Sequence, residues 1–190
     1  MTEQYSISHR IKEAARYIAM KRASLWKKWE RNDYFKSYSI LERNWQGCIA
    51  EVYLREIYPR LILGQPLVIK GRSISECDYV YKDAGVELKC NRFKYHYKHF
   101  LKNVEEHAYK ASLAETLICT GINGPPASAT DFFIFGWIKM SDVEKCDIWT
   151  PETGPHIKSP AYAIPKKGLY PMKDFFSASD FKLSGFMEKL

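Results

Sequence analysis

The sequence lacks the cysteine pattern of a disulfide-stabilised or zinc-binding domain. Its five cysteines contain no Cys-x-x-Cys pair and are spread singly through apolar segments. An odd, scattered set argues against a disulfide framework, and most are expected to be small buried residues in a reducing compartment. Cys90 with His96 and His99 matches no common zinc spacing and has no fourth ligand, so a structural zinc site is not expected.

Signals for membrane insertion and secretion are also missing. The N-terminus has no apolar core of the signal-peptide type, and no apolar stretch approaches the length of a membrane span. Hydrophobic residues still make up 46% of the chain, which is ample for a buried core and argues against disorder. We therefore expect a soluble intracellular protein in the cytoplasm, or in the host-cell cytoplasm if it is viral.

Two common catalytic motifs do not occur. The glycine-containing segment 121–126 lacks the lysine and the helix that follow a phosphate-binding loop. No Gly-x-Ser-x-Gly sequence is present, so the nucleophile elbow of the α/β-hydrolases is excluded.

Positive charge is in excess and unevenly distributed. The net charge is +7, and the segment 10–36 holds nine lysines and arginines against three acids. A basic surface suits a polyanion such as DNA, although a merely basic protein would have the same composition. A second basic cluster, between Arg92 and Lys102, directly follows segment 77–89, which holds Asp78, Glu87 and Lys89. We expect nucleic-acid contacts from Lys21, Arg22, Lys27, Lys28, Arg72, Arg92, Lys94 and Lys98.

Residues 8–31 have the apolar stripe of a helix among basic positions. Such a helix could bind a nucleic-acid backbone, lie on a membrane surface, or pack into the core with its cationic face exposed to solvent. We divide the 190 residues into a basic helical extension, 1–41, and a main domain, 42–190, with a proline-rich tail.

The remaining pattern predicts alternating helices and strands. After a polar turn at 42–44 we expect a helix at 45–58, a strand at 66–70, a turn at 71–73, and two short strands around Asp78 and Glu87. A helix at 97–115, strands at 116–120 and 132–140, and a tail of loops and short strands follow. This order predicts an α/β fold, a central mixed β-sheet flanked by helices.

The segment 77–89 carries the clearest chemistry. It is expected to form two strands joined by a turn at 83–85. Because strand side chains alternate, Glu87 and Lys89 share one face and Leu88 takes the other. An antiparallel neighbour can bring Asp78 beside them. Two carboxylates and an ammonium at one sheet end could hold a hard cation and a water nucleophile.

Asp78, Glu87 and Lys89, preceded by a helix carrying Glu51, resemble the PD-(D/E)xK nuclease superfamily, which includes restriction endonucleases and Holliday-junction resolvases. The resemblance covers about residues 44–138, and segment 47–54 is similar to the family helix in which a small residue precedes the glutamate. Cys77 stands where the family name has proline, a variable position that supplies no ligand. The segments 135–138 and 162–175 are similar to small nucleases of phages and mobile elements.

The resemblance implies a restriction-endonuclease-like fold and a metal-dependent DNA endonuclease, which could act as a homodimer. Asp78, Glu87 and the Leu88 carbonyl would hold Mg²⁺ or Mn²⁺. Glu51 would bind water of the same ion, or a second ion. Lys89 would orient the attacking water and stabilise the charge of the transition state.

Each residue also has a plainer explanation. Glu87 and Lys89 could be a charged pair on a solvated strand face, and Asp78 could cap a turn. Glu42 and Glu56 compete with Glu51 for the helix position. Two other functions stay open: a nucleic-acid-binding module of the same fold that does not cleave, and a structural or partner-binding protein.

Overall fold

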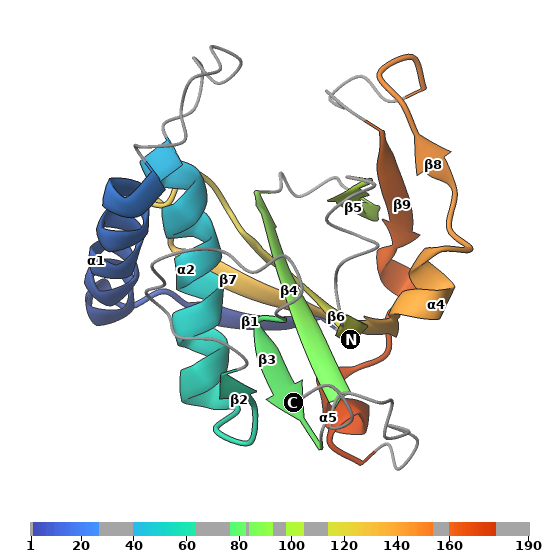
Figure 1. Cartoon of the computed structure of the whole chain (residues 1–190), viewed down its shortest axis with the longest axis horizontal. Helices are drawn as coiled ribbons and strands as arrows, with labels where there is room; N and C mark the ends of the chain where they lie inside the picture. Colours follow the sequence, from blue (N-terminus) through green and yellow to red (C-terminus); the bar gives the residue numbers. More distant parts are fainter. Residues whose placement is uncertain are drawn as a thin grey trace.

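The computed structural model describes residues 2–26, 40–63, 77–82, 84–92, 98–104, 114–153 and 160–177. They form a mixed α/β fold with a mixed β-sheet and several helices (Figure 1). The elements in chain order are β1 (Glu3–Ser6), α1 (His9–Trp26), α2 (Ile40–Ile57), β2 (Ile62–Leu63), β3 (Tyr79–Tyr81), β4 (Ala84–Arg92), β5 (His99–Asn103), β6 (Ala114–Ile122), β7 (Asp131–Lys139), α4 (Met140–Val143), β8 (Ile148–Trp149), β9 (Ala161–Pro165), η2 (Lys166–Gly168) and α5 (Met172–Phe175).

The main sheet has six strands in the order β1-β7-β6-β4-β3-β2. Strand β4 is parallel to β6, and the other neighbouring pairs are antiparallel. A second sheet of three strands has the order β5-β9-β8. Strands β6 and β7 are buried along almost their whole length, because both faces of the main sheet are covered.

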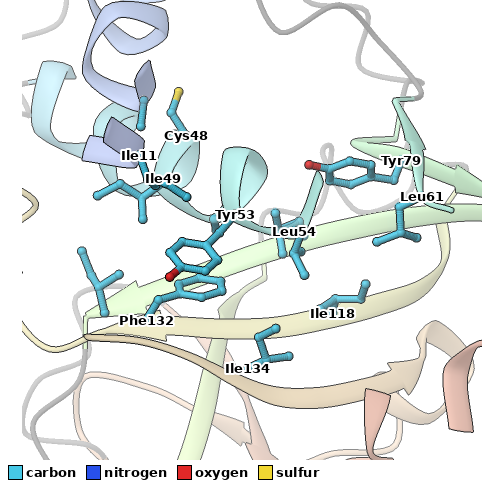
Figure 2. Close-up of a cluster of buried hydrophobic side chains, with 14 of the residues drawn as sticks. Ile11, Cys48, Ile49, Tyr53, Leu54, Leu61, Tyr79, Ile118, Phe132 and Ile134 are labelled. Carbon is cyan, nitrogen blue, oxygen red and sulfur yellow. The ribbon is translucent and has the colours of Figure 1, made fainter. Parts of the chain in front are cut away.

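The helices α1 and α2 lie side by side over one face of the main sheet (Figure 1). Figure 2 shows the apolar side of α2 directed at this face, with Tyr53 lying over Phe132 of β7. Those two rings stack with centroids 4.7 Å apart. The indole of Trp45 donates a hydrogen bond to the Lys12 carbonyl at 3.0 Å, which joins the two helices. Burial of this apolar face is the main force that positions α2 over the sheet.

The other face of the main sheet is covered by a second apolar cluster. It includes Phe100 of β5 and Ile164 of β9, packed with Leu117 and Cys119 of β6. Ile118, between those two β6 residues, belongs instead to the cluster under the helices. The alternation along β6 therefore separates a helix-covered face from a face covered by the small sheet.

Strands β6 and β7 confirm the predicted strands 116–120 and 132–140, and α1 and α2 confirm helices in the two predicted regions. Two boundaries were wrong. The segment 42–44 lies inside α2, and Ala84 and Gly85 are paired residues of β4 rather than a turn. The predicted strand 66–70, the turn 71–73 and positions 27–31 of the first helix lie outside the described residues.

The predicted helix at 97–115 was also wrong, because residues 99–103 form strand β5. This strand pairs antiparallel with β9, with Phe100 opposite Ile164 and Lys102 opposite Tyr162. The pairing partner lies about sixty positions later in the chain, so nothing in the local pattern indicated it. A tertiary contact here overrides the local preference.

The division at residue 41 stays a prediction. Strand β1 pairs with β7, and Ile11 and Ala15 of α1 are buried in the same cluster as α2, so β1 and α1 both contribute to the main core. All five cysteines are free, and Cys48, Cys77 and Cys119 are buried. No helix in the described part of the chain is both long enough and apolar enough to span a membrane.

Candidate active site

The candidate site lies where β3 begins beside the middle of β4. Tyr79 pairs with Val86, so one further step in the same register puts Asp78 opposite Glu87. The Asp78 carboxylate accepts a hydrogen bond from the Leu88 backbone N–H, with Oδ2 2.8 Å from the nitrogen. The antiparallel arrangement of β3 and β4 thus brings Asp78 next to the segment that carries the other two predicted residues.

Glu87 and Lys89 share the face of β4 that is directed away from α1 and α2. Their β6 neighbours, Leu117 and Cys119, belong to the cluster under the small sheet, whereas Leu88 is buried under the helices. Lys89 Nζ lies 2.5 Å from Glu87 Oε1, and their side chains are 38% and 16% exposed. The ammonium is therefore next to the carboxylate and still reaches solvent.

The Leu88 carbonyl points to the same side of β4 as the Asp78 carboxylate. In an antiparallel ladder the N–H and C=O of one residue face the same neighbouring strand, and the Leu88 N–H bonds Asp78. The next two carbonyls already accept side-chain bonds, from Thr120 to Lys89 at 2.9 Å and from Gln46 to Cys90. The backbone that carries the site is thus fixed to β6 and to α2.

Glu51 is nine-tenths buried on α2, and both of its carboxylate oxygens bind one arginine. The Arg22 nitrogens Nη1 and Nη2 lie 2.8 and 2.6 Å from Oε1 and Oε2, respectively. The backbone carbonyl of Glu51 also accepts a hydrogen bond from the Tyr79 hydroxyl of β3. Glu51 therefore lies beside the strand that follows Asp78, in contact with α1.

Burial, and then the negative charges of Glu87 and Glu51, raise the pKa of Asp78 to about 7. Lys89 and the Leu88 N–H act in the opposite direction. Near neutral pH Asp78 is therefore only partly ionised, and a cation bound by this carboxylate would have to displace its proton.

The oxygen donors of Asp78, Glu87 and the Leu88 carbonyl are the hard ligands that Mg²⁺ and Mn²⁺ prefer. Across the described ranges, no three His, Cys, Asp or Glu side chains form a group that could hold a metal ion. An ion at this site would therefore have two protein carboxylates and would depend on water and backbone oxygen for its other ligands. Mg²⁺ usually keeps several waters, so this ligand set fits it.

Lys102 of β5 is a charged neighbour of the site that the sequence did not single out for chemistry. The residue as a whole is only 6% exposed. Burial, followed by the charge of Lys89, lowers the pKa of Lys102 to about 8, while Glu87 and Asp78 act in the opposite direction. Strand alternation would have aligned Lys102 with buried Phe100, but the segment was predicted as a helix.

The eight residues expected to contact nucleic acid have different environments. Lys21 and Lys98 are exposed, and the Lys21 ammonium lies 5.4 Å from the centre of the Tyr17 ring. Arg22 binds Glu51, and Arg92 lies 3.5 Å from a Glu42 oxygen. Their contacts with DNA stay predictions, and the other four, Lys27, Lys28, Arg72 and Lys94, lie outside the described residues.

The raised pKa of Asp78 predicts how stability changes with pH when no divalent ion is present. The folded chain binds this proton more tightly than the unfolded chain does, where the pKa is near 3.8. The free energy of unfolding should therefore fall as pH rises from about 4 to about 7 and then level off. The total loss should be at most about 4 kcal/mol. Urea unfolding at several pH values measures this.

The matched control is Asp78→Asn, which carries no charge at any of these pH values. The wild type should lose stability relative to this variant across the window. Added Mg²⁺ should restore the wild type at pH 8 and leave the variant unchanged. Identical pH profiles for the two proteins would contradict the raised pKa of Asp78.

The candidate site is thus defined by the geometry, burial and charges of its residues. Asp78 directly precedes β3, Glu87 and Lys89 lie on β4, and Glu51 lies on α2. No protein-family model, curated protein or solved structure matches this chain.

Proposed function

We propose that the protein is a metal-dependent endonuclease that hydrolyses phosphodiester bonds in DNA. The observation that supports this most is the approach of Asp78 to β4, where its carboxylate binds the Leu88 N–H between Glu87 and Lys89. Two acids, an ammonium and a carbonyl are the groups that hydrolysis of a phosphodiester with a divalent ion requires.

Each residue has a distinct role in this proposal. The carboxylates of Asp78 and Glu87, with the Leu88 carbonyl, would hold Mg²⁺ or Mn²⁺. When bound, the ion would lower the pKa of a water molecule and neutralise charge on the phosphate. Lys89, which now pairs with Glu87, would hold the attacking water by a hydrogen bond and stabilise negative charge on the phosphate oxygens.

The topology supports a restriction-endonuclease-like fold. A helix that carries a buried acid precedes the antiparallel pair β3–β4, and β4 is parallel to β6. The strand β5, which follows the Glu-x-Lys segment, departs from the helix expected there. The basic residues of α1 and of the segment 92–102 would attract the DNA backbone.

A second candidate is a module of the same fold that binds nucleic acid without cutting it. The ion pairs Lys89–Glu87 and Arg22–Glu51 favour it, because they already balance charge without a metal. The two candidate functions differ in whether the protein cleaves DNA when a divalent metal ion is present.

The direct test is incubation of the wild-type protein with supercoiled plasmid in Mg²⁺ or Mn²⁺, with EDTA as the control. We expect nicked circles to accumulate only with the metal. DNA retardation at low salt without nicking would favour the binding module. Absence of DNA binding even at low salt would contradict both candidates and leave a structural or partner-binding role.

A further inference from the structure

Arg22 and Glu51 form a bidentate ion pair beside the candidate site. Each oxygen of the carboxylate accepts from a different guanidinium nitrogen, at 2.8 and 2.6 Å. The side chains are only 18% and 12% exposed, respectively. A bidentate contact of this geometry, largely shielded from water, is much stronger than an ordinary surface pair.

This pair belongs electrostatically to the candidate site. Burial opposes the charge of Arg22, but the hydrogen bonds and the charge of Glu51 outweigh it, and Asp78 adds to them, so that the pKa of Arg22 stands above its ordinary value. Glu51 in turn is among the charges that act on Asp78. The Tyr79 hydroxyl fixes the Glu51 backbone to the strand next to Asp78.

Glu51 is oriented toward the arginine rather than toward the other acids. Within the described part of the chain, Glu51 does not combine with Asp78 and Glu87 into a group of three metal-ligating side chains. To bind a cation directly, Glu51 would have to give up at least part of its bidentate contact with Arg22, which weakens a largely buried ion pair.

We propose that the site takes a single divalent ion and that the Arg22 guanidinium, held by Glu51, occupies the place of a second cation. The proposal rests on the proposed nuclease function and specifies its metal requirement. Glu51 is then a positioning residue for Arg22 and not a metal ligand. Arg22 is permanently charged, so its guanidinium is present beside the site whether or not a metal ion is bound.

The test is a titration of the folded protein with Mn²⁺, followed by electron paramagnetic resonance and calorimetry. We expect one ion per chain in the wild type. Glu51→Gln should still bind one ion, with a dissociation constant within about threefold of the wild type. Asp78→Asn should bind it about 100-fold more weakly, because it loses a direct ligand. Circular dichroism checks that each variant is folded.

Two ions per wild-type chain, or a tenfold or greater loss of Mn²⁺ affinity in Glu51→Gln, would overturn the single-ion proposal, even if the protein cleaves DNA. Absence of both Mn²⁺ binding and cleavage in the wild type would overturn the nuclease function itself.

The role of the cation is tested by Arg22→Lys and Arg22→Met. Both should keep one Mn²⁺, but the lysine variant should retain far more cleavage than the methionine variant, by about tenfold or more. Equal cleavage by these two folded variants would show that the charge at position 22 is not used. If Arg22 had only a structural role, the substitutions would change the free energy of unfolding, but the two folded variants would cleave DNA at equal rates.

Discussion

Replacing Asp78 by alanine is expected to abolish metal-dependent DNA cleavage and to leave DNA binding in place. The substitution removes one of two carboxylates from the site and the hydrogen bond to the Leu88 N–H. Loss of a direct ligand removes several kcal/mol of electrostatic stabilisation, and each step of about 1.4 kcal/mol is tenfold in rate, so we expect a loss of about 1,000-fold or more. The initial rate of plasmid nicking over a Mg²⁺ series measures it.

Asp142→Ala is the matched control for this experiment. Asp142 is an acid on α4 that pairs with Lys145 at 2.8 Å on the surface. Its removal should change the rate by less than about twofold, because exposed ion pairs contribute little. If Asp78→Ala kept more than a tenth of the wild-type rate at every metal concentration, Asp78 would not be a ligand and the mechanism would be wrong.

Gly136→Ala is expected to destabilise the fold strongly. Gly136 of β7 has φ near 131°, and a Cβ there would lie 2.3 Å from the Tyr170 carbonyl oxygen. That carbonyl has little freedom to move, because Trp137 and Tyr170 exchange two backbone hydrogen bonds of 2.9 Å. We expect the free energy of unfolding to fall by about 3 kcal/mol or more, measured by urea denaturation.

Gly168→Ala provides the comparison. A Cβ at Gly168 would meet nothing nearer than the Pro165 Cβ at 4.0 Å, and its φ is not in the left-handed region. Its effect should stay within about 1 kcal/mol. Equal urea midpoints for the two glycine variants would show that the close approach of β7 to Tyr170 does not exist in solution.

Gly136 also has a link to the candidate site. It pairs with Cys119 of β6, next to an irregularity in the register, and Cys119 pairs with Lys89 on the other side. Bulges of this kind are frequent beside active sites, where they re-aim neighbouring side chains. In the fraction of Gly136→Ala protein that still folds, we therefore expect a lower rate of DNA cleavage, because the pairing next to Lys89 is disturbed.

The local pattern of β4 was sufficient to predict how its side chains are directed. Alternation alone placed Glu87 and Lys89 on one face, and the structure has Leu88 under the helices on the other. The long apolar runs at 116–120 and 132–140 likewise predicted strands, because a strand covered on both faces must be apolar throughout. The functions of these residues remain predictions.

Lys102 and Arg22 illustrate what the pattern did not contain. The sequence pattern predicts Lys102 in a helix at 97–115, but pairing with Tyr162 of β9 places it in a buried strand beside the site. Arg22 was expected on an exposed nucleic-acid-binding surface. Its actual partner is Glu51, twenty-nine positions away on another helix.

The sequence by itself determined the period of each element and which side chains share a face, because these depend on residues only a few positions apart. Tertiary structure alone decided that residues 99–103 form strand β5, that Lys102 is buried, and that Arg22 pairs with Glu51. Those features depend on contacts between distant segments, whose free energies exceed the weak local preferences that a sequence pattern expresses.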